Sequence, residues 1–116
     1  MLALAAALLA GSGSTHADEA KVMVVAVRYE VTEQVPDRLE QTVADPLQHT
    51  LMELPGVTAL NSTVSHGYVN VDVQFEGGAT EKDVATVSRR IDELVLDSEV
   101  VVTSRTVRLA PAPTAR

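Results

Sequence analysis

The stretch from residue 51 to residue 78, LMELPGVTALNSTVSHGYVNVDVQFEGG, constrains the fold of this chain more than any other. Within it, two runs of alternating apolar and polar residues flank the pair His66-Gly67. A two-residue hairpin turn needs positive φ, which glycine adopts freely and histidine more readily than most residues. The preceding Leu54-Pro55-Gly56 is a helix stop, because proline cannot continue a helix and glycine accepts the left-handed residue beyond it. The stretch therefore predicts the end of a helix followed by a β-hairpin.

The turn at His66-Gly67 also predicts the register of the hairpin. One face pairs Val64 with Val69, Ser62 with Val71, Leu60 with Val73 and Thr58 with Phe75. The other face pairs Ser65 with Tyr68, Thr63 with Asn70, Asn61 with Asp72 and Ala59 with Gln74. The first face is largely apolar and the second largely polar, as a half-buried antiparallel pair requires. A slip by one residue would pair unlike faces, so we expect this register.

Hydrophobic spacing predicts the elements around the hairpin. Alternation over residues 22–31 indicates a first strand. Apolar residues then recur every three or four positions from Pro36 to about Glu53, which indicates a helix that Pro46 should bend. A second helix is expected to begin at Thr80, an N-cap with Asp83 three residues on, and to end at Asp97-Ser98.

A last strand is expected over residues 99–109. The resulting order β-α-β-β-α-β predicts an α+β, ferredoxin-like fold, in which a four-stranded antiparallel sheet carries two helices on one face. This fold hosts many unrelated functions and does not by itself assign one.

The two ends of the chain differ in composition from its middle. Residues 1–17 are interpreted as a signal peptide, because the ten apolar residues MLALAAALLA are too few to span a membrane. No lysine or arginine precedes this run, so the true start is expected upstream of Met1. Thr15-His16-Ala17 fits a small-x-small cleavage site, which predicts a mature chain beginning at Asp18. The alternative is that the run is the remnant of a longer membrane helix. Residues 18–109 form the expected domain, and residues 110–116, with two prolines, a disordered tail.

Composition argues against several classes of function. The net charge of −7 and the three aromatic residues oppose binding to nucleic acid or insertion of the mature chain into an anionic membrane. The chain has no cysteine, and His49 and His66 lack the spacing of a metal-ligand pair, so no metal or other cofactor is expected. The loop of residues 32–36 is acidic and therefore unsuited to binding phosphate. No catalytic, cofactor-binding or metal-binding residue is therefore assigned, and we expect no enzyme activity.

Residues 43–84 resemble the first porter subdomain of resistance–nodulation–division (RND) efflux transporters. The matching features are Pro46-Leu47, the stop Leu54-Pro55-Gly56-Val57, the pair Ser62-Thr63, Gly67, and the alternation Val71-x-Val73-x-Phe75. The resemblance extends over residues 22–95, and so over most of the expected domain, residues 18–109. Val35 departs from it, because a small capping residue is expected before the first helix. The membrane helices and proton-relay carboxylates of these transporters have no counterpart in this sequence, so transport activity does not carry over.

The resemblance implies a non-enzymatic periplasmic domain that acts through protein–protein contacts. Its expected partners are an envelope transporter component or a second copy of the chain. A chain that is a fragment of such a transporter would be membrane-associated. Arg105 and Arg108 in the last strand are expected to guard a sheet edge or to meet an acidic partner surface. The alternative is a free-standing secreted module that binds a small ligand on the open, polar face of the sheet, which carries Asn61, Thr63, Asn70 and Asp72.

Overall fold

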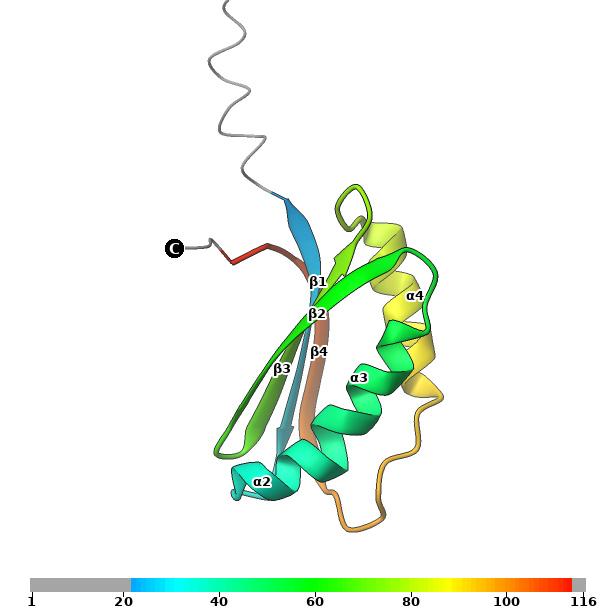
Figure 1. Cartoon of the computed structure of the whole chain (residues 1–116). Helices are drawn as coiled ribbons and strands as arrows, with labels where there is room; N and C mark the ends of the chain where they lie inside the picture. Colours follow the sequence, from blue (N-terminus) through cyan, green and yellow to red (C-terminus); the bar gives the residue numbers. More distant parts are fainter. Residues whose placement is uncertain (1–21, 114–116) are drawn as a thin grey trace, which may run out of the picture.

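The computed structural model describes residues 22–113 and shows a four-stranded antiparallel sheet with helices on one face (Figure 1). The strand order is β2-β3-β1-β4, which confirms the predicted α+β, ferredoxin-like arrangement. Residues 1–17, predicted to be a signal peptide, lie outside the described residues. The elements are β1 (Met23–Val31), α2 (Pro36–Leu39), a π-helical turn η1 (Glu40–Ala44), α3 (Asp45–Met52), β2 (Val57–Ser65), β3 (Tyr68–Phe75), α4 (Glu81–Asp92) and β4 (Val102–Pro111).

The core lies between the sheet and the helices. Alternate valines of β1 and β3 meet the apolar side chains that recur along the helices, as period-two and helical spacing require. These side chains are almost fully buried: Val25, Val27, Val69, Val71, Val73, Leu39, Val43, Leu47, Leu51, Val87 and Ile91. This packing turns the opposite face of the sheet toward solvent.

The predicted hairpin register is confirmed from Ala59 to Ser65. Gly67 has the positive φ that the turn requires, at +86°. The prediction fails at one pair, because Phe75 faces Val57 rather than Thr58. A bulge between Val57 and Ala59 leaves Thr58 exposed, where its hydroxyl donates to the Gln74 carbonyl oxygen at 3.3 Å. The bulge thus places an apolar side chain beside Phe75 and a polar one in water.

The first helix accommodates Pro46 through a π-helical turn. Proline lacks the N–H for a helical hydrogen bond, and its ring crowds the carbonyl group four residues earlier. The chain widens just before it, so that the Asp45 N–H donates to the Glu40 carbonyl oxygen. Val43 and Leu47, on either side of this point, both remain fully buried. The bend predicted at Pro46 is therefore realised as a π-turn that keeps the apolar stripe facing the core.

The second helix begins as predicted and ends earlier. The Thr80 N–H donates to the Asp83 carboxylate at 2.9 Å, which confirms this half of the predicted capping box. The helix ends at Asp92, before the predicted stop at Asp97-Ser98. Asp97 instead closes a separate turn, with its carbonyl oxygen accepting from the Val100 N–H at 2.9 Å. Asp97 therefore marks a turn within the connection between α4 and β4, and not the end of the helix.

The last strand is shifted toward the C-terminus. It runs from Val102 to Pro111 instead of residues 99–109, so Ala110 and Pro111 belong to β4 and not to the predicted tail. Pairing with β1 holds them there, because Val24 faces Ala110 and Met23 faces Pro111. The Ala112 N–H continues this contact by donating to the Val22 carbonyl oxygen at 2.7 Å.

Candidate functional site

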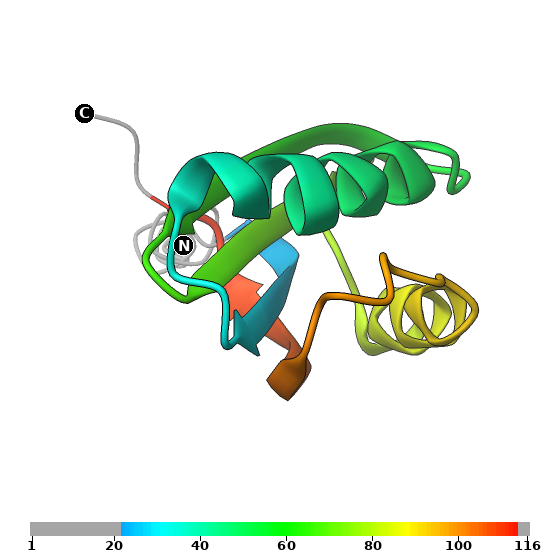
Figure 2. The same ribbon diagram turned by 90° about the horizontal axis from the view of Figure 1, so that it is seen from below.

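The open face of the sheet is the candidate site. The first helix, made of α2, η1 and α3, and the second helix, α4, both lie on the other side of the sheet when it is seen along the strands (Figure 2). The register places Asn61 opposite Asp72 and Thr63 opposite Asn70, on the polar face that the sequence predicts. The structure adds Arg28 from β1 and Arg108 from β4 to the same face, through the pairs Arg28 with Asn70 and Ala26 with Arg108.

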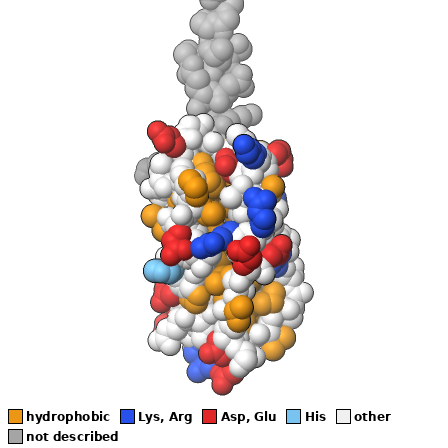
Figure 3. Space-filling model, turned by 90° about the vertical axis from the view of Figure 1, so that its right-hand side faces the viewer, with side chains coloured by type: hydrophobic (Ala, Val, Ile, Leu, Met, Phe, Trp, Pro, Cys, Tyr) orange, Lys and Arg blue, Asp and Glu red, His pale blue; other side chains and the backbone are white. Residues whose placement is uncertain are grey.

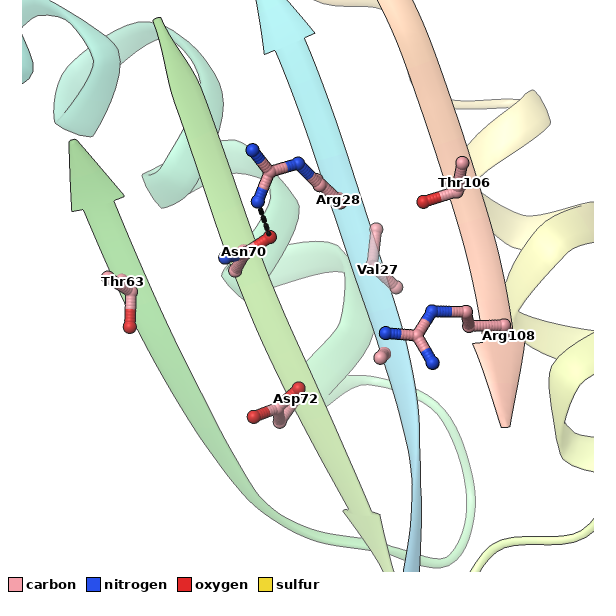
Figure 4. A pocket seen from close by; sticks show the side chains of 8 residues that line it. Val27, Arg28, Thr63, Asn70, Asp72, Thr106 and Arg108 are labelled. Carbon is pink, nitrogen blue, oxygen red and sulfur yellow. Dashed lines mark hydrogen bonds between the residues drawn. The ribbon is translucent and has the colours of Figure 1, made fainter. Parts of the chain in front are cut away.

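A shallow hollow of about 230 Å³ lies at the centre of this face (Figure 4). Its floor includes Ala26, which is small and stands between Asp72 on β3 and Arg108 on β4. The hollow exists because the larger neighbours rise around this alanine. Its full lining is Ala26, Val27, Arg28, Thr63, Asn70, Asp72, Thr106 and Arg108.

Arg28 is held in place by three neighbours on the open face. Its Nε donates to the Glu30 carboxylate at 3.0 Å, and its Nη1 donates to the Asn70 amide oxygen at 3.3 Å. Its guanidinium carbon lies 4.1 Å from the centre of the Tyr68 ring, a cation–π contact. These contacts fix the position of one positive charge at the rim of the hollow.

Asp72 and Arg108 place opposite charges across the floor of the hollow. Partial burial raises the pKa of Asp72 above its ordinary value, and the positive charge of Arg108 opposes this rise. Burial outweighs the opposing charge, so the fold disfavours ionised Asp72. A cationic or hydrogen-bonding partner in the hollow would therefore stabilise the ionised form of Asp72.

We expect Asp72→Asn to raise the free energy of unfolding at pH 7 by less than about 1 kcal/mol, since the charge is only partly buried and solvent screens it. The raised pKa of Asp72 means that its favourable contribution is complete below the unfolded value of 3.8 and is lost as pH rises through the folded pKa. In urea unfolding, the free energy of unfolding of the variant should therefore exceed that of the wild type at pH 7 and equal it at pH 3. Glu76→Gln, at an exposed carboxylate, controls for the loss of one negative charge. A benefit that persists at pH 3 contradicts the assignment.

The two arginines of the last strand lie on opposite faces of the sheet. Arg105 faces Tyr29 of the core and forms an ion pair with Asp92 at the end of α4. Burial raises the pKa of Tyr29, and Arg105 opposes this effect. Arg105 thus ties β4 to α4, and Arg108 is the arginine of β4 that reaches the candidate site. That these arginines guard the edge of β4 or meet an acidic partner surface stays a prediction.

The residues weighed for metal or phosphate chemistry lie apart from the hollow. His49 is exposed on α3, with its Nε2 3.7 Å from Oε2 of Glu53. His66 lies in the hairpin turn, with its Nδ1 3.0 Å from the Gln34 carbonyl oxygen. Within residues 22–113, no three His, Asp or Glu side chains come together as a metal site. The acidic loop accounts for the unusual Val35 cap, because Glu33 accepts from the Val35 N–H at 2.9 Å and from Arg38 Nε at 2.9 Å. A carboxylate from the chain itself thus accepts the N–H group of the residue that caps the first helix.

The helical side of the molecule mixes apolar and charged side chains (Figure 3). Arg90 of α4 donates to the Glu53 carboxylate at 2.8 Å, so charges join the two helices. Val95 in the connection after α4 is 88% exposed. Among the helices of the described residues, none is long and apolar enough to cross a membrane.

Comparison with known proteins gives a match of fold. No protein-family model matches the chain, and no match is found among curated proteins. The structure is similar to part of a crystal structure of a heavy metal efflux pump, with a TM-score of 0.64 and 18% sequence identity. The match covers 88% of this chain and 11% of the pump, so the chain spans a small part of the pump's length. The resemblance to an efflux-pump domain is thereby confirmed in fold, and the chain has the architecture of one small part of such a pump.

Proposed function

We propose that the chain is a non-enzymatic periplasmic domain of the RND porter type, which acts through protein–protein contacts. It serves an envelope transport system, either as a separate component or as a piece of a transporter. The observation that supports this most is the match of fold with part of a heavy metal efflux pump over 88% of the chain. The periplasmic assignment rests on the signal-like segment of residues 1–17.

The open face suits a wet protein interface. Its central side chains are polar or charged, and Arg28 is already positioned by Glu30, Asn70 and Tyr68. Protein interfaces commonly contain such hydrogen-bonding groups together with bridging water. Preordered side chains also lower the entropy that association costs.

A small-ligand module is the second candidate, and the hollow is the observation that favours it. With Arg28, Asp72 and Arg108 around its floor, the hollow would suit a small zwitterion. Its volume of about 230 Å³ lies below the 300–1,000 Å³ typical of ligand pockets. Protein contact is therefore the better-supported function.

Photo-crosslinking in cells tests the proposed function. A crosslinking amino acid at Thr63, exposed on the open face, is expected to yield adducts with an envelope protein or a second copy. The same amino acid at Lys82, exposed on α4, is the control and is expected to yield far less. Equal labelling from both positions contradicts the proposal. So does a monomer without adducts that binds a small molecule in the hollow, which would establish the second candidate.

A further inference from the structure

The sheet has two outer strands, β2 and β4. Within the described residues, each pairs with a strand on one side only. The outer side of such a strand presents unpaired backbone N–H and C=O groups, which can pair with another chain. Proteins normally protect these edges with charges, proline, bulges or a covering segment.

The two edges differ in protection. Strand β4 carries Arg105 and Arg108 and ends at Pro111, which has no N–H to donate. Strand β2 has the sequence VTALNSTVS, without a charge or a proline. Its middle residues Asn61, Ser62 and Thr63 are exposed, and its bulge lies at the far end between Val57 and Ala59. The regular part of β2, residues 59–65, is thus an unguarded edge.

This regular part is complementary to itself. In an antiparallel pair of two copies centred on Ser62, Leu60 faces Val64 on the helical side of the sheet. On the open side, Asn61 faces Thr63 and Ala59 faces Ser65. Every pair joins side chains of the same face, as strand pairing requires, and no like charges oppose each other. The Gln48 side chain of α3 donates to the Ser62 hydroxyl at 2.8 Å, which leaves the backbone of Ser62 able to pair.

We propose that β2 pairs with β2 of a second copy, antiparallel about Ser62, and joins two four-stranded sheets into one. This inference rests on the proposed function, because it specifies the surface and partner of a protein contact. The contact uses the same strand on both copies and therefore closes as a twofold dimer. Growth beyond the dimer is blocked because the guarded β4 strands form its outer edges. The net charge of −7 per chain opposes association, so the dimer should tighten with added salt.

A disulfide-trapping experiment on the full chain tests the pairing. The sequence contains no cysteine, so one introduced thiol reports on one position. Ser62→Cys is expected to form a disulfide-linked dimer under mild oxidation. The Cα atoms of directly opposed residues lie about 4.5–5.5 Å apart, which is within the range that a disulfide can bridge. Ser104→Cys, the same substitution at an exposed position of β4, is the matched control. We expect at least about tenfold more dimer from Ser62→Cys; association through any other part of the chain would affect both variants alike.

A lysine substitution at the same position completes the test. Ser62→Lys places two ammonium groups opposite each other and should weaken dimerisation in sedimentation by at least about tenfold, whereas Ser104→Lys should not. Equal trapping of the two cysteine variants, or a dimer unchanged by Ser62→Lys, overturns the inference. If Ser62→Cys traps a different envelope protein instead of its own copy, the self-pairing is wrong and the proposed function stands. Unaltered circular dichroism of each variant shows that it has folded.

Discussion

Leu47→Ala is expected to lower the free energy of unfolding by about 3 kcal/mol. Leu47 is fully buried on α3, within the cluster that joins the helices to the sheet. Removal of its side chain forfeits the burial of several carbon atoms and leaves a cavity. The adjacent Pro46 restricts the backbone, so the helix has little freedom to close around the cavity. Urea unfolding followed by circular dichroism measures the loss.

Met52→Ala is the matched control for Leu47→Ala. Met52 lies at the end of the same helix, and its side chain is 51% exposed. Truncation there removes little buried surface and should cost less than about 1 kcal/mol. Similar urea midpoints for the two variants would show that the apolar stripe of α3 does not face the core as described.

Gly67→Val should destabilise the domain by more than about 1 kcal/mol, since it forces a β-branched residue into the left-handed region. Gly67 has φ +86°, and a Cβ atom at this position would lie 2.8 Å from Nε2 of Gln34. The Gly67 carbonyl oxygen also accepts from the Val31 N–H at 2.9 Å, so a distorted turn disturbs β1 as well. The urea midpoint is the measurement.

Gly67→Asn separates backbone strain from simple crowding. Asparagine tolerates positive φ far better than valine does, although both carry a Cβ atom. The asparagine variant should therefore lose clearly less stability than the valine variant. Equal midpoints for Gly67→Val and the wild type would refute the turn at His66-Gly67.

Local signals in the sequence determined much of this fold. The turn at His66-Gly67 and the alternation around it predicted the hairpin pairing of residues 59–65, because side chains two apart share a face. The Thr80 and Asp83 pair marked the start of α4 through a contact across three residues. The same alternation predicted the open face with Asn61, Thr63, Asn70 and Asp72. Each of these predictions depends on residues close together in the chain or joined by one tight turn.

Only the tertiary structure decided features that depend on distant pairing. The bulge at Thr58 brings Val57, and not Thr58, opposite Phe75 on the neighbouring strand. The extension of β4 to Pro111 depends on its pairing with the start of β1, which lies at the other end of the described residues. The same pairing sends Arg108 to the open face and Arg105 to Asp92 on the helical face. Alternation alone divides a strand into two faces, but which face packs on the core is fixed only when its partner strand sets the register.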